Sequence, residues 1–397
     1  MGIDSRHTFL NHVAQTSPFP LLIEVEKAEG SYIYDKSGKA YLDLISGIAV
    51  TNIGHRHPKV ISAITAQLSK YMHVMAYGEF IQEPQNELAL KLNEILPESL
   101  NSTYFVNSGT EAIEGAIKLA KRVTGRTELI SCKKSYHGST HGALSISGNE
   151  TKKFRHRPLL PGVKFIEHNS IEDLDQISKN TAAVIVELIQ GDAGVRIASQ
   201  TYVSALRQKC SEVGALLIVD EVQTGFGRTG KWFSFDHYNI VPDVIAIAKA
   251  FGGGMPIGAF ISDKKLMEQL SDNPTLGHIT TFGGHPVNCA AALANICVIQ
   301  EEALIDGVEK KGKLLEDSIN HSAIKDIRRK GLMLAVEFES AEIVEKIVDE
   351  CLKRGIITFY FLSCPESFRL APPINISEID LRNAIQILNE SIEKVMN

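Results

Sequence analysis

Polar side chains follow several short apolar runs of this 397-residue sequence, at positions where the strands of an α/β sheet present ligands. Asn107-Ser108-Gly109-Thr110 lies between the run 103–106 and a helical stretch that begins near Glu111. A turn of this kind offers free backbone N–H groups, two hydroxyls and the positive end of a helix dipole, which suit a phosphate group. It would also serve as an ordinary helix N-cap, so by itself the turn indicates either role.

Asp220-Glu221 ends the apolar run 215–219, and an acidic pair in this position is also typical of the Walker B strand of nucleotide triphosphatases. Such an enzyme needs a phosphate loop. The segment 225–231 has the G-x-x-x-x-G-K spacing, but Trp232 follows it instead of Ser or Thr and no strand directly precedes it. The segment 307–313 is followed by Leu314 and lies in a helical pattern, so neither segment is a phosphate loop.

Lys249 follows the apolar run 244–248 and precedes three consecutive glycines, 252–254. An unpaired ammonium group at the end of a buried strand is costly, whereas a lysine held in a covalent Schiff base is neutralised. The glycines would let a flat ligand lie close to the backbone. The alternative is a lysine whose long side chain reaches the surface.

Arg369 stands near the C-terminus, shortly before Pro372-Pro373. Its guanidinium group could bind a carboxylate through two parallel hydrogen bonds, and the prolines would stiffen the segment that presents it. The alternative is a surface ion pair. Together the four positions offer a phosphate cradle, a strand-end carboxylate, a strand-end lysine and a carboxylate-binding arginine, which is what pyridoxal phosphate chemistry on an amino acid requires.

These side chains depend for their positions on an alternation of short apolar runs and amphipathic stretches. The runs are too short and too continuously apolar for half-exposed strands, so they predict the buried strands of a largely parallel sheet. The predicted strands are 103–106, 128–131, 182–186, 215–219, 244–248 and 257–261. Helices are predicted between them, for example over 110–123 and 200–213, and a glycine would end each of these two.

The element pattern divides the chain into three parts. A hairpin is predicted over 32–43, and the alternating pattern gives way near residue 290 to a helix, a strand, a helix, a strand and a helix. These later elements are expected at 301–320, 332–338, 341–354, 355–361 and 377–396. We therefore expect an N-terminal segment (1–45) packed with the small domain, a large cofactor-binding α/β domain (46–290) and a small α+β domain (291–397).

Composition excludes several other classes of protein. The chain has 41 Lys and Arg against 47 Asp and Glu, a net charge of −6 and no basic cluster, so nucleic acid is not expected as its main partner.

The six cysteines are scattered without a C-x-x-C pair, which argues against disulfides and structural zinc and for a reducing compartment. His137 and His141 lack the Glu of H-E-x-x-H, so no metal site is expected. No signal peptide and no apolar run of membrane-spanning length is found, so we expect a soluble cytoplasmic protein without a membrane partner.

Over essentially its whole length the sequence resembles the class III (ω-amino) aminotransferases of the fold-type I pyridoxal-phosphate family. The most specific stretch of the resemblance is the run 220–230, DEVQTGFGRTG. The other motifs are Gly54-His55-Arg56-His57-Pro58, Asn107-Ser108-Gly109-Thr110-Glu111-Ala112, Tyr136-His137-Gly138, Ala248-Lys249 with its glycines, Thr281-Phe282-Gly283-Gly284 and Arg369-x-x-Pro-Pro. The resemblance implies an α/β fold with a mostly parallel central sheet flanked by helices, and a smaller C-terminal α+β domain.

The resemblance also implies a role for each matching residue. Lys249 would bind pyridoxal 5'-phosphate covalently and later move a proton, and Asp220 would face the pyridine nitrogen and keep it protonated. The other implied cofactor contacts are Ser108, Gly109 and Thr110 at the phosphate, Gln223 at the phenolic oxygen, Tyr136 on the ring face with His137 beside it, Glu187 after its strand, and Thr281 from a second subunit. A homodimer with shared active sites follows from the last of these.

Two departures from the family bear on the substrates. Arg369 would bind a substrate carboxylate, and Asp192 stands where a longer carboxylate of relatives can pair with that arginine. Ser139 replaces the arginine that usually follows His-Gly and binds a second substrate carboxylate. Lys133, Lys134, Arg155 and Arg157 are the candidates to replace it; without a replacement, we expect a weaker preference for donors with a distal carboxylate.

Within the class, the resemblance is closest to acetylornithine and ornithine aminotransferases. It implies amino transfer from acetylornithine, another acylornithine or ornithine to 2-oxoglutarate, giving a semialdehyde and glutamate, with a place in arginine biosynthesis. The enzymatic alternatives are a putrescine (diamine) or 4-aminobutyrate aminotransferase and a class III aminomutase. A nucleotide-dependent ATPase or regulatory module is the alternative from another class, and the absorbance spectrum of the purified protein would separate it from a pyridoxal phosphate enzyme.

Overall fold

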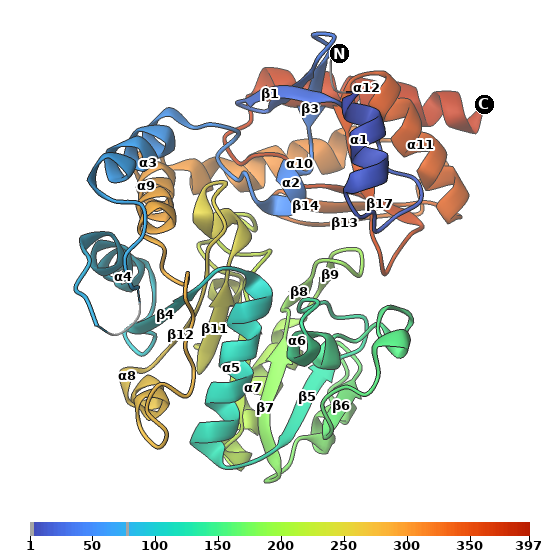
Figure 1. The fold of residues 1–397 in the computed structure, drawn as a ribbon. Helices are drawn as coiled ribbons and strands as arrows, with labels where there is room; N and C mark the ends of the chain where they lie inside the picture. Colours follow the sequence, from blue (N-terminus) through green and yellow to red (C-terminus); the bar gives the residue numbers. More distant parts are fainter. Residues whose placement is uncertain (1–3, 77–78) are drawn as a thin grey trace.

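The structure, a computed structural model, describes residues 4–76 and 79–397; the first residues of the predicted N-terminal segment therefore lie outside it. Seven short apolar strands form a central sheet in the order β4-β12-β11-β10-β7-β5-β6 (Figure 1). They are β4 (Ser102–Val106), β5 (Glu128–Cys132), β6 (Val163–Ile166), β7 (Thr181–Val186), β10 (Leu216–Asp220), β11 (Val244–Ile247) and β12 (Gly258–Ser262). Only β12 runs antiparallel to its neighbours, β11 and β4. The predicted, largely parallel sheet is confirmed.

Helices cover both faces of this sheet. The side chains of a strand point alternately to the two faces, so the apolar side chains on each face need a helical layer to bury them. In β7, Ala183 and Ile185 belong to the apolar cluster that contains α5 (Gly109–Thr124), whereas Val184 and Val186 belong to the cluster that contains α7 (Gln200–Val213). Both helices end as predicted, at Gly125 and Gly214, whose left-handed backbone (φ 66° and 71°) glycine adopts without strain. The sheet is therefore buried on both sides, and its ligands must enter at a strand end.

The N-terminal hairpin forms as predicted and joins the C-terminal part of the chain. Strands β1 (Val25–Glu29), β2 (Tyr32–Asp35) and β3 (Ala40–Asp43) are antiparallel, and β15 (Ile356–Ile357) adds to β3 in parallel. The Tyr32 hydroxyl also donates a hydrogen bond to Asp380. Figure 1 accordingly shows the blue N-terminal strands beside the orange and red C-terminal elements. Four helices belong to this end of the chain: α1 (Ser5–His12), α2 (Ser46–Ala49), α3 (Pro58–Lys70) and α4 (Glu83–Ile95).

The C-terminal part is a smaller α+β unit. Its antiparallel sheet has the order β13-β14-β17-β16, and three helices accompany it. The bounds are β13 (Asp326–Lys330), β14 (Met333–Glu337), β16 (Phe359–Tyr360), β17 (Ser367–Leu370), α10 (Val308–Ser318), α11 (Ala341–Lys353) and α12 (Glu378–Met396). The predicted strand 355–361 is divided between β15 and β16, which belong to different sheets.

The prediction of one helix over 301–320 is wrong. Helix α9 (Pro286–Glu301) ends where that helix was expected to begin, and Ala303 adopts φ 47°, which breaks the helical path before α10. The predicted domain boundary at 290 and 291 falls inside α9, so the division into domains stays a prediction. Among the described residues no single helix has the length and apolar composition to cross a membrane, although α9 and Leu304–Ser318 pass that test as a pair bent by 62°.

Arg228 joins three distant parts of the chain. It lies in the segment 225–231, and its side chain is fully buried. Its guanidinium donates to the carbonyl oxygens of Leu332 (2.8 Å) and Pro372 (2.6 Å) and to Oδ1 of Asn52 (2.6 Å). Burial lowers the pKa of this guanidinium to about 9, against a smaller opposing effect of Asp43. The segment that imitates a phosphate loop in sequence is thus an internal connection between elements.

Candidate active site

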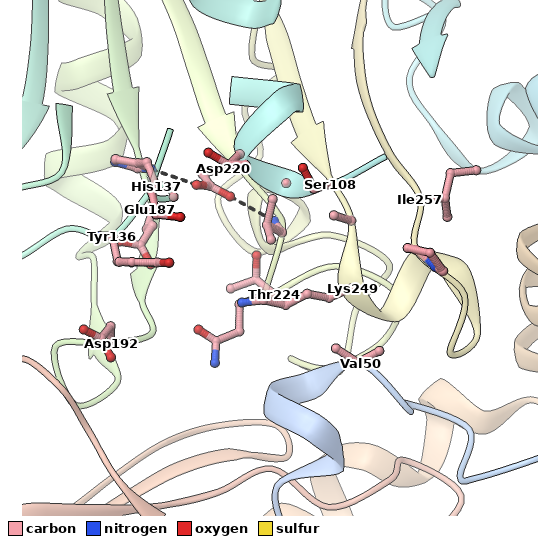
Figure 2. A pocket seen from close by; sticks show the side chains of 18 of the residues that line it. Val50, Ser108, Tyr136, His137, Glu187, Asp192, Asp220, Thr224, Lys249 and Ile257 are labelled. Atoms are coloured by element: carbon pink, nitrogen blue, oxygen red, sulfur yellow. Dashed lines mark hydrogen bonds and ion pairs between the residues drawn. The ribbon is translucent and has the colours of Figure 1, made fainter. Parts of the chain in front are cut away.

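A cavity of about 450 Å³ opens at the carboxyl ends of the central strands (Figure 2). Its volume is in the range that holds a cofactor or small ligand. All of the predicted site residues line it except Thr281 and Arg369; those present are Ser108, Gly109, Thr110, Tyr136, His137, Ser139, Glu187, Asp192, Asp220, Gln223 and Lys249. The topology brings them together because parallel strands end at one edge of the sheet.

One end of the cavity is the N-terminus of α5. The Ser108 side chain caps the helix by accepting a hydrogen bond from the Glu111 N–H (3.3 Å), so the N-cap reading is correct for this side chain. The Glu111 carboxylate in turn accepts from the Asn107 N–H (2.7 Å). Gly109 has no room for a side chain, since a Cβ there would lie 2.8 Å from Cγ1 of Val222. The result is a tight turn with exposed backbone at the positive end of a helix, which also fits an anion.

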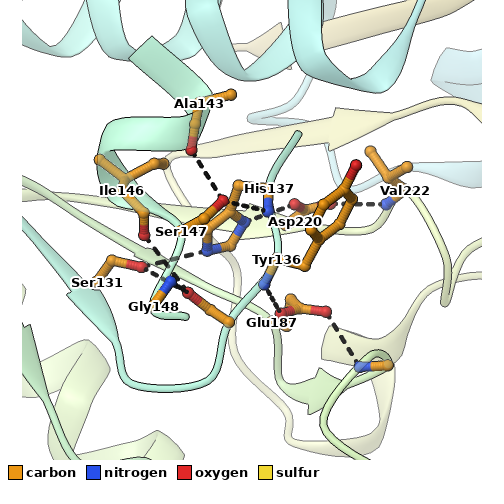
Figure 3. A network of polar contacts seen from close by, with 12 residues as sticks. Ser131, Tyr136, His137, Ala143, Ile146, Ser147, Gly148, Glu187, Asp220 and Val222 are labelled. Carbon is orange, nitrogen blue, oxygen red and sulfur yellow. Dashed lines mark hydrogen bonds and ion pairs between the residues drawn. The ribbon is translucent and has the colours of Figure 1, made fainter. Parts of the chain in front are cut away.

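Asp220 is the last residue of β10 and is held by two hydrogen bonds (Figure 3). Its Oδ2 lies 2.7 Å from Nδ1 of His137, and its Oδ1 accepts from the Val222 N–H at 3.0 Å. Nε2 of His137 lies 3.2 Å from the Ser131 hydroxyl. Burial acts to lower the pKa of His137, but the hydrogen bond and charge of Asp220 outweigh it, so the pKa is raised. His137 thus holds the Asp220 carboxylate in place from behind.

Glu187 fixes the segment that carries Tyr136. Its carboxylate accepts hydrogen bonds from the backbone N–H groups of Tyr136 and Gly191, both at 3.0 Å (Figure 3). Burial raises the pKa of Glu187 to about 7, partly offset by His137. The Tyr136 side chain is 45% exposed and lies on the cavity wall. Glu187 therefore positions an aromatic ring that is free to stack on a flat ligand.

Lys249 lies two residues after the end of β11 and begins a short 3-10 turn. Its backbone is left-handed (φ 50°), a conformation that side chains other than Gly, Asn and Asp rarely adopt and that is typical of functional sites. Burial lowers the pKa of the Lys249 ammonium, against the raising effect of Asp220. A lowered pKa increases the neutral amine, which is the form that attacks a carbonyl group.

Arg369 lies in β17, outside the cavity lining and next to Asp192. Its Nη2 is 3.4 Å from Oδ1 of Asp192, and its guanidinium lies over the Phe361 ring, 4.4 Å from the centroid. Nε of Arg369 has no hydrogen-bond partner among the described residues. Asp192 also accepts from the Leu362 N–H (3.2 Å) and the Ser363 hydroxyl (2.9 Å). Burial lowers the pKa of Arg369, against the raising effect of Asp192. The guanidinium group thus has its Nη2 paired with Asp192 and its Nε without a hydrogen-bond partner among the described residues.

Several residues lie elsewhere than at this cavity. Thr281 is exposed and does not line it. None of the four candidates to replace the arginine missing at Ser139 lines it either: Lys133 pairs with Glu167, Arg157 with Glu150, Arg155 lies over the Phe154 ring, and Lys134 is outside the lining. Sequence reasoning assigned no role to Val50, Thr224 and Ile257, which line the cavity. Thr224 belongs to the run 220–230, whereas the apolar side chains of Val50 and Ile257 carry no chemical signal.

The residues present fit pyridoxal phosphate. A helix N-terminus without side-chain obstruction suits its phosphate, a buried carboxylate suits its ring nitrogen, and a lysine of lowered pKa suits its aldehyde. Figure 2 shows these groups around one space, with Ser108 and Ile257 on one side and Tyr136 and Asp192 on the other. When bound, this cofactor accepts the electron pair left by a broken bond at the substrate carbon.

Comparisons with known proteins agree with this chemistry. Residues 13–392 match the family described as "Aminotransferase class-III". The acetylornithine aminotransferase of Archaeoglobus fulgidus is 40% identical over 95% of this chain and 97% of its own, and that of Methanopyrus kandleri is 38% identical over 96% of each. A structure of the ornithine aminotransferase from Toxoplasma gondii, with partial occupancy of PLP, is 28% identical with a TM-score of 0.90 over 98% of this chain and 94% of that one. The chain therefore belongs to the class III aminotransferases, enzymes that use pyridoxal phosphate to transfer an amino group.

Proposed function

We propose that this enzyme transfers the amino group of an ornithine-type donor, such as acetylornithine, another acylornithine or ornithine, to 2-oxoglutarate, giving a semialdehyde and glutamate. The observation that carries the proposal is the buried Arg369–Asp192 pair beside the cavity. A paired arginine suits an amine without a carboxylate at that end, and a released arginine suits the carboxylate of a 2-oxo acid. The acetylornithine and ornithine aminotransferases among its relatives support the same donor class.

Lys249 and Asp220 would carry the chemistry common to all donors. The Lys249 amine would bind the cofactor covalently, and after release its Nζ would take the proton from the substrate carbon and return it to the cofactor. Asp220 would accept a hydrogen bond from the protonated ring nitrogen and keep that proton in place, with His137 holding the carboxylate from behind at 2.7 Å. Ser108, Gly109 and Thr110 would hold the phosphate, Gln223 the phenolic oxygen and Tyr136 the ring face.

Two substrates of different charge would use the same pocket in turn. With Asp192 engaged, Arg369 is neutralised and the pocket accepts the amine end of the donor. When 2-oxoglutarate or glutamate binds, its α-carboxylate would displace Asp192 and bind the arginine through two hydrogen bonds. The hydrogen bonds from Leu362 and Ser363 give the displaced Asp192 partners to keep.

We also propose a homodimer in which Thr281 of each subunit contacts the phosphate in the other. Thr281 is exposed, and large apolar side chains on the same and a neighbouring segment are exposed as well. They include Met72 (63%), Ile81 (93%), Ile279 (63%) and Phe282 (55%), and the Phe282 ring lies 5.1 Å from that of His73. Such a surface favours burial against a second copy. The six free cysteines, five of them buried, suit a reducing cytoplasmic environment.

The role of Lys249 is tested by borohydride reduction followed by peptide mapping. Reduction fixes a cofactor to the lysine that carries it, so the pyridoxyl label is expected on the peptide that contains Lys249. Lys249→Ala should give no label and no single-turnover amino transfer. Label on another lysine would exclude this assignment.

The donor class is tested with a panel against 2-oxoglutarate: ornithine, N-acetylornithine, N-succinylornithine, 4-aminobutyrate, lysine and putrescine. We expect an ornithine-type donor to give the highest kcat/KM and glutamate to form in equal amount to the semialdehyde. Highest activity with putrescine or 4-aminobutyrate would replace the proposed donor by one of those amines. Rearranged product without glutamate would indicate an aminomutase.

A further inference from the structure

A second cavity of about 270 Å³ adjoins the active-site cavity. The two cavities share part of their lining, namely Tyr136, Gly138, Ser139 and Asp192. Figure 2 shows Tyr136 and Asp192 on the side of the active site away from Ser108, so the second cavity continues from the end opposite the proposed phosphate site. A donor whose amine reacts near Lys249 would extend into it past Ser139, whose small side chain leaves the way open.

Basic side chains line part of the second cavity. Lys152 and His156, from two consecutive 3-10 turns (Glu150–Lys152 and Phe154–His156), line it together with His141. Among the described lining residues the one carboxylate is Asp192, which already accepts hydrogen bonds from Leu362 and Ser363. The cavity therefore has unused positive charge and hydrogen-bond donors, which suit an anionic group.

The neighbours of Lys152 show why this lysine stands apart. Arg157 forms an ion pair with Glu150 at 2.5 Å, and Lys153 donates to the Ser147 carbonyl at 2.8 Å and lies over the Phe165 ring. Lys152, by contrast, has no ion pair or side-chain hydrogen bond with any described residue. Arg155, Arg157 and Lys153 of the segment 152–157 thus contact groups within or beside the segment, whereas Lys152 and His156 line the second cavity.

We propose that Lys152, with His156 as a second hydrogen-bond donor, binds the distal carboxylate of the amino donor. Lys152 would thus take over the role of the arginine that usually stands at the position of Ser139. The inference rests on the proposed function and narrows it: the donor is an ω-amino acid, free or acylated, whose carboxylate lies at the end away from the transferred amine. None of the four basic residues that the sequence offered for this role reaches the cavities, whereas Lys152 lines the second one.

The test compares Lys152→Gln, Lys152→Arg and a control, Lys265→Gln, in the holoenzyme. Lys265 is an exposed lysine of α8 (Lys264–Met267) and lines neither cavity. Single-turnover amino transfer is followed by the cofactor's absorbance with N-acetylornithine, putrescine and glutamate. Lys152→Gln should raise the half-saturating concentration of N-acetylornithine, and that of glutamate through its γ-carboxylate, about 10- to 100-fold, the loss of one charge-assisted contact. Putrescine, which has no carboxylate, should stay within about twofold of the wild type. Lys152→Arg and Lys265→Gln should behave like the wild type, and adding Ser139→Arg to Lys152→Gln should restore N-acetylornithine binding.

Three results would overturn the assignment. An unchanged response to N-acetylornithine in Lys152→Gln would remove Lys152 from donor binding and leave the proposed function intact. Equal losses for all three substrates, or equal losses in Lys152→Gln and Lys152→Arg, would indicate a structural effect instead of charge recognition. A wild type that accepts no donor with a distal carboxylate would overturn both the proposed donor class and this inference.

Discussion

At the scale of single residues, Asp220 shows how a charge is kept in a nearly dry site. It is 5% exposed, and its two oxygens are engaged by His137 and the Val222 N–H. A carboxylate in this position can face a protonated ring nitrogen without a large rearrangement, because its partners already compensate the lost hydration. The geometry thus supports an electrostatic role for Asp220 that an uncharged residue of the same shape would not fill.

Asp220→Asn is expected to retain the cofactor and to slow single-turnover amino transfer about 100-fold or more. Removing one partner of a buried charge pair costs about 3–5 kcal/mol, and each 1.4 kcal/mol corresponds to a factor of ten. The measurement is the rate with saturating donor, with the bound cofactor quantified in the same sample. An unchanged rate would exclude Asp220 from stabilising the ring proton.

The neighbouring carboxylate, Glu221, has a structural role instead of a place in the cavity. Glu221 is fully buried and does not line the cavity. It accepts hydrogen bonds from the Ser234 hydroxyl (2.6 Å), the Phe235 N–H (3.1 Å) and the Thr224 hydroxyl. Burial outweighs these bonds and raises the pKa of Glu221 from 4.5 to about 7. The pair that imitates a Walker B motif is therefore one active-site anion and one internal structural acid.

Glu221 should make the enzyme less stable as the pH rises. The pKa of Glu221 is higher in the folded protein than in the unfolded chain. Its favourable contribution to the free energy of unfolding is therefore full below pH 4.5 and is lost as the pH rises through about 7. Between pH 5 and 8, Glu221→Gln should gain on the order of 3 kcal/mol of unfolding free energy relative to the wild type, since one pKa unit is about 1.4 kcal/mol. Chemical denaturation of the holoenzyme measures this, with the exposed Glu345→Gln as control; a pH-independent difference would contradict it.

At the scale of elements, the start of α5 determines whether a phosphate can approach. A Cβ at Gly109 would lie 2.8 and 2.9 Å from the two methyl groups of Val222, so Gly109→Ala must displace the turn or Val222. We expect cofactor binding to weaken about 10- to 100-fold, the usual range of an overpacking cost of 1–3 kcal/mol. Fluorescence titration of the apoprotein with pyridoxal phosphate measures it.

Two further variants separate crowding from loss of the helix. Gly109→Ala with Val222→Ala should recover cofactor binding, because the second change removes the methyl groups that obstruct the first. Gly125→Ala, at the other end of α5, meets no atom within 4 Å but forces alanine into φ 66°. It should cost about 1 kcal/mol of stability and leave cofactor affinity unchanged. Equal effects of Gly109→Ala and Gly125→Ala on cofactor affinity would contradict a local role of Gly109.

The elements that could be predicted from the sequence are those marked by a single clear pattern, such as a continuous apolar run or a glycine after a helix. Fully apolar runs identified β7, β10 and β11, and a following glycine identified the ends of α5 and α7. Edge strand β6 was missed because Lys164 interrupts its apolar run. The Lys164 side chain is exposed and pairs with Glu128, so the sequence shows neither a continuous apolar run nor a regular alternation of apolar and polar residues. The antiparallel direction of β12 depends on its neighbours, and no local pattern encodes it.

The candidate site was predictable where chemistry follows a strand. Ser108, Asp220 and Lys249 were found because parallel strands bring their carboxyl ends together whatever the sequence between them. Lys152 and His156 were missed because they stand in short 3-10 turns of a long connection, without periodicity or a preceding strand. Contacts between such turns and a distant cavity arise from tertiary packing alone, which the sequence does not display.

At the scale of the whole molecule, the proposed shared site predicts complementation between inactive subunits. Lys249→Ala lacks the cofactor-binding lysine, and Thr281→Val is expected to bind phosphate too weakly for activity. After unfolding and refolding together, each mixed dimer would contain one site with both Lys249 and Thr281 intact. Activity should therefore appear in the mixture and be absent from either variant alone. No recovery in a mixture shown by mass spectrometry to contain mixed dimers would exclude shared sites.

The parallel pairing of β3 with β15 has a consequence for how the protein is made on the ribosome. β3 leaves the ribosome early, but its partner is residues 356–357, so more than 300 residues are synthesised before that edge is covered. Until then β3 is an edge strand with open N–H and C=O groups, the kind of surface on which nascent chains associate. In a chain that stops before residue 356, this edge of β3 therefore has no β15 to cover it and is open to pairing with another chain.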